Sequence, residues 1–216
     1  MAVLTPLSVP GLRANELGMG LYLGDVIHLV APHWTVVSEH DAMSLINKHG
    51  LARSYAQMRS DAEVSHILDR DILRKVGEAV GARYVFQPRL AHFEQAMTDR
   101  WTLAGFDVLL SQTRSAIMRL TLKIWDTKSG ELIWASMAES SLQSETVVQD
   151  PVYLEDISRV TFGSMLADLV NRKTSSTYTP LNHVLDLLIR EEASKEANAQ
   201  QSEPVVDQEV QEEQEK

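Results

Sequence analysis

The stretch RLTLKIWDTKSGELIWASMAES, residues 119–140, predicts a β-hairpin. Its first half alternates apolar and polar residues, which is the pattern of a strand with one buried and one solvated face. The segment 126–130 predicts the turn, because Asp and Ser side chains bond to the nearby backbone and glycine adopts positive φ readily. Trp125 and Trp134 flank the turn, and would fix the strand register if they pair across it.

Strand and helix patterns alternate upstream of this hairpin. The expected elements are, in order, a strand in AVLTPL (2–7), a helix over 16–30, a strand in HWTVVSE (33–39), a helix over 42–48 capped by Ser38 or Asp41, a helical stretch over 51–68, a helix ending at Gly81, and a strand over 84–93 interrupted by Pro88. Proline lacks an N–H to donate, so Pro88 indicates a sheet edge or a bulge.

Helices and then an acidic tail follow the hairpin. Apolar spacing predicts one helix over about 152–172 and a second, amphipathic C-terminal helix over 179–198 that opens with Thr179-Pro180. From Glu191 onward the chain has nine acidic residues and two lysines, a net −7 of its total −10. We expect residues 199–216 to be a disordered acidic tail. The predicted fold class is therefore α/β: a single domain over 1–178 with helices packed on a mixed β-sheet, followed by that helix and tail.

Composition excludes several classes of partner and chemistry. An acidic chain without a Lys/Arg cluster repels phosphate backbones, so we expect no nucleic-acid partner. The chain has no cysteine, which removes disulfides, thiolate catalysis and Cys-based zinc sites. No apolar run approaches the ~20 residues of a transmembrane helix. Because a strand begins almost at Met1, we expect that a signal segment was removed upstream.

No catalytic, metal or cofactor motif stands out. The seven histidines form no H-x-x-x-H or H-E-x-x-H arrangement, and no G-x-S-x-G occurs. The sequence therefore predicts a non-enzymatic protein without a metal or cofactor. An alternative is small-molecule or nucleotide binding at the Gly18–Gly24 turn, GMGLYLG, with Glu39 where a ribose-binding acid would lie. Its third glycine is one residue late for the dinucleotide pattern G-x-G-x-x-G.

The connection QAMTDRWTLAGFDVLLSQTR, residues 95–114, is unusually apolar for a link between two strands. Such residues are buried either by folding back as an extra strand or lid, or by a partner. A membrane-spanning hairpin would need arms of ~9–11 residues, and the apolar part supplies about half of that on each side of Ala104-Gly105. The candidate interaction residues are Trp101, Leu103, Phe106, Val108, Leu109 and Leu110.

Residues 2–172 resemble the curli-secretion-channel (CsgG-type) superfamily of bacterial envelope proteins. VGARYVFQPRL (80–90) is similar to that family's helix ending in a Gly-Ala pair before a strand, and IWDTKSGELIWA (124–135) to its Asp-Thr-x-x-Gly-Glu hairpin. The superfamily includes lipoprotein activators of penicillin-binding proteins and the TolB amino-terminal-like domain. The chain differs in lacking a lipobox cysteine and, from its sequence, the long membrane-spanning hairpins of the channel, so we expect no pore.

The resemblance implies a non-enzymatic interaction or assembly protein of the bacterial envelope or of a secretion system. Its expected partner is another protein or a second copy of itself, as a homo-oligomer. The expected location is the periplasm in association with the outer membrane, through a lipid anchor that this chain does not contain.

Overall fold

The computed structural model describes residues 1–16, 18–104, 107–146 and 153–171; within 97–104, 107–114 and 144–146 it describes the strands alone. The described strands form a mixed five-stranded sheet in the order β1-β3-β4-β5, with β2 also paired to β3. Their bounds are β1 Ala2–Val3, β2 Leu7–Ser8, β3 Tyr84–Ala104, β4 Asp107–Asp126 and β5 Leu132–Thr146. β1 and β2 run parallel to β3, whereas β3, β4 and β5 are antiparallel.

The described α-helices begin and end close to the positions that their sequence signals predict, and a 3₁₀ helix that was not predicted precedes them. Their bounds are the 3₁₀ helix η1 Pro10–Asn15, α1 Met19–Val30, α2 Glu39–Lys48, α3 Ala52–Ser65, α4 Arg70–Val80 and α5 Leu154–Val170. Ser38 caps α2 by accepting a hydrogen bond from the Asp41 N–H, and Asp69 caps α4 in the same way from Ile72. The α4 helix ends at Gly81, whose φ of 65° is the left-handed conformation that glycine favours.

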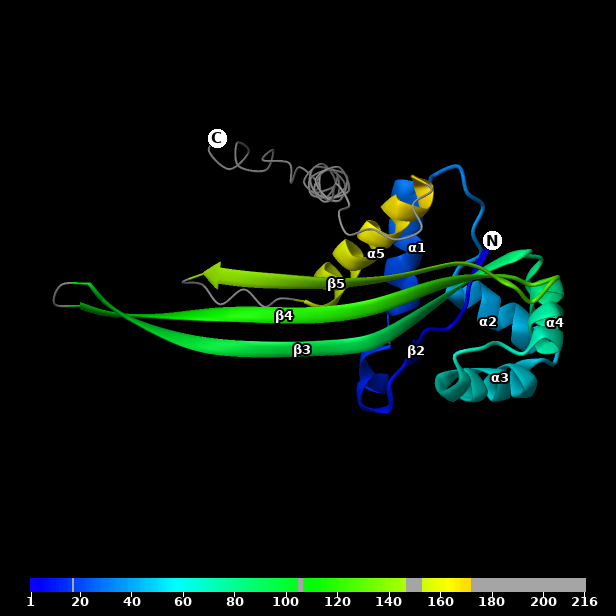
Figure 1. Cartoon of the computed structure of the whole chain (residues 1–216), viewed down its shortest axis with the longest axis horizontal. Coiled ribbons are helices and arrows are strands. Elements are labelled where there is room, and N and C mark those ends of the chain that lie inside the picture. The colour runs from blue at the N-terminus through cyan, green and yellow to red at the C-terminus, as the bar shows by residue number, and fades with distance from the viewer. Residues whose placement is uncertain (17, 105–106, 147–152, 172–216) are drawn as a thin grey trace, which may run out of the picture.

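The sheet has a different set of helices on each face, which produces two separate apolar cores. α1 and α5 cover one face, where Leu23 and Phe162 pack with Phe86, Met118 and Leu120. α2, α3 and α4 cover the other face near β1 and β2, in a second core that the described residues keep apart from the first. Figure 1 shows the two sets on opposite sides of the strands.

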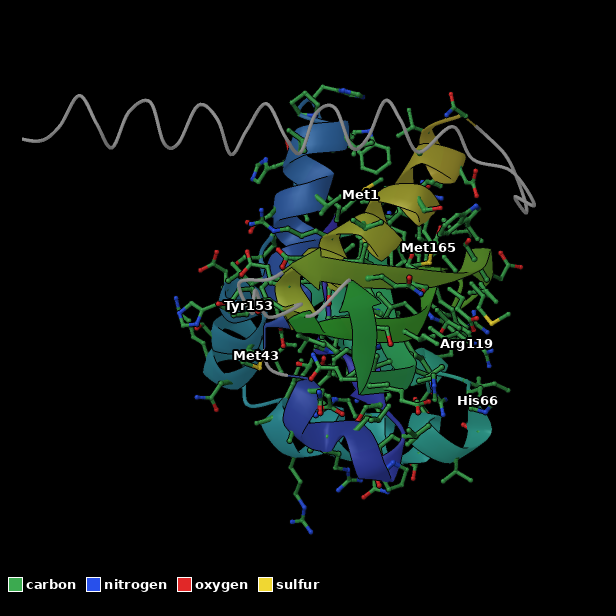
Figure 2. All side chains as sticks on the ribbon, turned by 90° about the vertical axis from the view of Figure 1, so that its left-hand side faces the viewer. Met1, Met43, His66, Arg119, Tyr153 and Met165 are labelled. Atoms are coloured by element: carbon green, nitrogen blue, oxygen red, sulfur yellow. The ribbon has the colours of Figure 1, made fainter. Side chains whose placement is uncertain are left out.

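The same layering is visible along the strands. Viewed from the end of the long strands, α5 with Met165 lies above the sheet, and Met43 and His66 lie on its other side (Figure 2). The predicted mixed α/β fold of a single domain is therefore confirmed. The helix expected over 179–198 and the tail over 199–216 lie outside the described residues, so both stay predictions.

Three local predictions from the sequence need correction. HWTVVSE is not a strand: it contributes only an isolated bridge between Val37 and Ala2, because the following residues begin α2 at once. The two hairpin tryptophans do not pair. A register shift next to Trp125 sets Trp125 opposite Leu132 and Trp134 opposite Ile124, and the two indoles join different cores.

Pro88 does not interrupt its strand, because its missing N–H lies where no partner is present. β1 pairs with residues 85–86 of β3 and β2 with residues 89–90, so Pro88 faces the break between these two short strands. Its carbonyl accepts a hydrogen bond from Gln87 Nε2, which also donates to Thr5 O across the break. The edge predicted at Pro88 thus exists on one side, within a continuous strand.

The two motifs that carry the family resemblance contact each other. The Thr127 Oγ1 lies 3.0 Å from the carbonyl oxygens of Ala82 and Arg83, and Arg83 Nε bonds to Asp126 Oδ2 at 3.0 Å. A Cβ on Gly77 would lie 2.3 Å from Thr127 Oγ1, so only glycine leaves room for this contact. The end of α4 and the β4–β5 turn are therefore one joint of the fold.

Candidate functional site

The apolar segment 95–114 is not a loop or lid. β3 and β4 run through it as one long hairpin, with 21 residues in β3 and 20 in β4, and it extends well beyond the described helices (Figure 1). The short apolar arms expected on each side of Ala104-Gly105 are thus parts of much longer strands, whereas the expectation that no hairpin of this chain spans a membrane stays a prediction. The sequence did not predict these strands because polar residues interrupt the apolar pattern. Antiparallel strands tolerate such residues, since only one face of the sheet needs to be apolar.

The strand register brings the predicted interaction residues together in pairs. Trp101 is opposite Leu110, and Leu103 is opposite Val108. Residues two apart on a strand share a face, so these four lie on one face of the hairpin end. Leu109 pairs with Thr102 on the other face. Phe106, the sixth predicted residue, lies outside the described residues.

A β-bulge sets which face this is. Leu90 pairs with Leu120, and His92 with Arg119, so Ala91 is left without a partner in the ladder. Beyond the bulge Phe93 pairs with Met118, and both pack into the core beneath α1 and α5. Counting on from Phe93, the four apolar residues at the hairpin end continue the face that α1 and α5 cover at its base.

The opposite face of the hairpin is polar. Its cross-strand pairs include Thr98 with Thr113 and Arg100 with Ser111. At the base of the extension, Glu94 and Ala96 on this face are already exposed to solvent. The end of the hairpin therefore has one face with four apolar residues and one face that is mostly polar, with Leu109 as its apolar exception.

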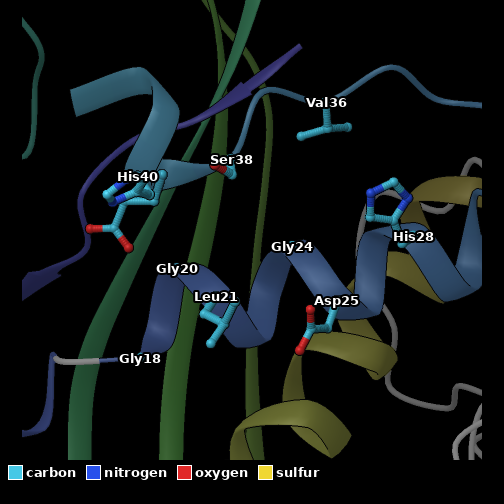
Figure 3. A pocket seen from close by; sticks show the side chains of 10 residues that line it. Gly18, Gly20, Leu21, Gly24, Asp25, His28, Val36, Ser38 and His40 are labelled. Atoms are coloured by element: carbon cyan, nitrogen blue, oxygen red, sulfur yellow. The ribbon is translucent and has the colours of Figure 1, made fainter. Parts of the chain in front are cut away.

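A second candidate site lies between α1 and the start of α2. It is a cavity of about 420 Å³, open to solvent on one side and shown in Figure 3. From α1 it is lined by Gly18, Gly20, Leu21, Gly24, Asp25 and His28, and from the opposite segment by Val36, Ser38, Glu39 and His40. The sequence indicated the glycines and Glu39, whereas Val36 and the two histidines come together only through the fold.

Glu39 lines this pocket beside the first turn of α1. A Cβ on Gly20 would lie 1.8 Å from Glu39 Oε2, so the carboxylate packs directly on the backbone of α1. Burial raises the pKa of Glu39, the nearby Arg59 lowers it in part, and Glu16 raises it again. Among the described residues, no hydrogen-bond donor or ion-pair partner is within bonding distance of this carboxylate.

The pocket does not have the geometry that a nucleotide phosphate requires. Dinucleotide sites place their glycines in a turn between a strand and a helix, where the backbone N–H groups meet the pyrophosphate. Here Gly18 follows η1, and Gly20 and Gly24 lie inside α1. The Glu39 carboxylate occupies the space beside the first turn of α1, and no Lys or Arg is among the residues that line the pocket.

The described residues contain no group of three or more His, Cys, Asp or Glu side chains arranged to hold a metal ion. None of the described helices has the length and apolarity needed to cross a bilayer.

Comparison with known proteins gives distant structural neighbours. No protein-family model and no curated protein matches the sequence. Lipoprotein GNA1162 from Neisseria meningitidis is 11% identical with a TM-score of 0.43, covering 79% of this chain and 94% of its own. The LpoB C-terminal domain from Salmonella enterica is 16% identical with a TM-score of 0.36, covering 66% and 81%.

A third neighbour is a putative neuraminyllactose-binding hemagglutinin homologue from Helicobacter pylori. It is 13% identical with a TM-score of 0.38, and the match covers 90% of this chain and 88% of that one. The structural neighbours thus include bacterial lipoproteins, at low identity and low structural similarity, and membership of the CsgG-type superfamily is not established by them.

Proposed function

We propose that this protein is a non-enzymatic component of the bacterial cell envelope that docks on a protein partner, or on a second copy of itself, through the end of the β3–β4 hairpin. The observation that carries the proposal is the register of the hairpin end, which places Trp101, Leu103, Val108 and Leu110 on one face. The envelope location rests on the sequence resemblance alone.

The apolar face at the end of the hairpin supports a contact with another protein there. The hairpin end extends beyond the described helices (Figure 1), so none of these helices covers its apolar face. Aromatic and aliphatic residues gathered in one patch on rigid strands are typical anchors of protein interfaces. The polar opposite face keeps the hairpin solvated on the side that makes no contact.

The test replaces the apolar pair Trp101 and Leu110 while preserving the hairpin. In the double variant Trp101→Asp, Leu110→Lys, opposite charges replace two residues that are paired across the strands, so the ladder keeps a favourable side-chain pair. We expect it to lose self-association or partner capture, because a charge in an apolar contact must be desolvated. Light scattering after size exclusion measures mass, and circular dichroism measures folding.

A matched control applies the same exchange to the polar face. Thr98→Asp with Thr113→Lys also places opposite charges at a paired position, on the face that the proposal leaves free. We expect this variant to assemble as the unchanged protein does. If both variants fold and behave alike in assembly and capture, the docking face is not where we place it.

A further inference from the structure

The pocket between α1 and α2 has an empty volume at one identifiable position. Gly20 and Gly24 are one helical turn apart on α1, but their surroundings differ. The space beside Gly20 is filled by Glu39, whereas a Cβ on Gly24 would meet no atom within 4 Å. The cavity of about 420 Å³ therefore includes free space beside Gly24, and this size falls in the range of small-molecule sites, roughly 300–1,000 Å³.

The apolar residues of the lining indicate that a ligand of this pocket carries an apolar group. Leu21 and Val36 line the cavity, and the bare backbone of Gly24 adds a surface against which a flat or aliphatic group can pack closely. Figure 3 shows Gly24 of α1 facing the segment that carries Val36 and Ser38. Burial of an apolar group here gains roughly 25 cal/mol for each Å² removed from water.

The charges around the pocket indicate that the ligand also carries a positive charge. Two groups of ionisable side chains flank it, and each has two carboxylates and one arginine. In the first, Arg59 pairs with Glu16 at 3.3 Å and lies close enough to Glu39 to lower its pKa. In the second, Arg159 pairs with Asp25 at 2.9 Å and with Glu155 at 3.1 Å. Each group has a net charge of −1 when its carboxylates are ionised.

Of the carboxylates that line the cavity, Glu39 is the one that can serve a ligand. The side chain of Asp25 points towards α5 (Figure 3), where it pairs with Arg159. Ser38 already accepts the capping hydrogen bond from Asp41. His28 and His40 also line the cavity, and neither makes a hydrogen bond to the Glu39 carboxylate.

We propose that this pocket binds a small organic cation, a protonated amine attached to an apolar group, with Glu39 as its counter-ion and the space beside Gly24 as the apolar subsite. This site is separate from the hairpin, so the proposal of a ligand here does not depend on the proposed docking function.

The experiment uses the full chain labelled with ¹⁵N, three phenylalkyl probes of similar size, and AMP. Phenethylammonium has the proposed charge, 3-phenylpropionate has the opposite charge, and 3-phenylpropan-1-ol has none. In ¹H–¹⁵N titrations we expect phenethylammonium to shift the amides of Gly20, Gly24 and Ser38, with an affinity at least ten-fold above that of the alcohol. The carboxylate and AMP are expected to cause no shift.

Two variants test the two halves of the site. Glu39→Gln removes the charge, and we expect it to weaken phenethylammonium binding at least ten-fold while leaving alcohol binding unchanged. Gly24→Leu places a side chain in the free space, and we expect it to abolish binding of both. Glu78→Gln on the exposed side of α4 is the control for loss of one negative charge.

Several results would overturn the proposal. One is no shift of the pocket amides with phenethylammonium at millimolar concentration. Another is equal binding of the cation and the carboxylate, and a third is unchanged binding by folded Gly24→Leu. Saturable binding of AMP at these amides would replace it with the nucleotide hypothesis.

Discussion

Glu39 is held in a place that disfavours its charge. Burial raises its pKa above the ordinary value of 4.5, and the opposing effect of Arg59 is partial. An acid with a raised pKa in the folded state contributes its full stability below the unfolded pKa and loses it as the pH rises through the folded pKa. Ionised Glu39 thus lowers the stability of the fold at neutral pH.

We therefore expect Glu39→Gln to unfold at a higher temperature than the unchanged protein at pH 7. The difference should shrink as the pH falls, and disappear below about 4.5, where the carboxyl is protonated in both states. Thermal unfolding followed by circular dichroism between pH 3.5 and 8 measures this, with Glu78→Gln as the charge control. A lower melting temperature for Glu39→Gln at pH 7 would mean that the α1 and α2 N-termini stabilise the carboxylate by more than burial costs.

At the scale of elements, the joint between α4 and the β4–β5 turn rests on the close contact of Gly77 with Thr127. We expect Gly77→Ala to cost about 1–3 kcal/mol, because its methyl group would lie 2.4 Å from the Cβ of Thr127, a contact that neither backbone can relieve without moving. Urea unfolding gives the free energy.

Gly24→Ala is the matched control for that prediction. It also lies within a helix, but its Cβ enters open space, so helix propensity should raise stability by about 0.5–1 kcal/mol. A loss of less than about 0.5 kcal/mol for Gly77→Ala would show that the joint is loose.

Elements with strong local signals were predictable from the sequence, and those defined by distant partners were not. The alternation in 119–124, the cap at Ser38 and the helix end at Gly81 are local, and each agrees with the structure. HWTVVSE has the β-branched residues of a strand, yet only Val37 bridges to β1 because α2 begins two residues later. Propensity does not report which partner strand is within reach.

For the candidate sites, the sequence likewise indicated the residues but not the contacts between them. The glycines on α1 and Glu39 were noticed together as a nucleotide motif, but the packing of Glu39 on Gly20 is a contact between two helices that no spacing in the sequence displays. The six hairpin residues were chosen for apolarity alone. Trp101, Leu103, Val108 and Leu110 continue the face that α1 and α5 cover because Ala91 is unpaired, and the place of that bulge follows only from the complete register.

For the whole molecule, stability should reside in the two cores and not in the chain's end. We expect deletion of residues 199–216 to change the melting temperature by less than about 2 °C, because this acidic stretch repels itself and has little apolar surface to bury. Differential scanning fluorimetry of the full and shortened chains makes the comparison. A drop of more than about 5 °C would show that these residues pack on the domain.

The unpaired residue at the β3 bulge also governs which changes of chain length the hairpin tolerates. Loss of Ala91 would leave every later residue of β3 with its present partner in β4, because Ala91 has none. Loss of one residue between Phe93 and Trp101 would instead move Trp101 to the opposite face relative to the body. A change of one residue in chain length therefore preserves the apolar face when it occurs at the bulge, and inverts that face when it occurs between the bulge and Trp101. Differences in length among related chains should accordingly lie at the bulge.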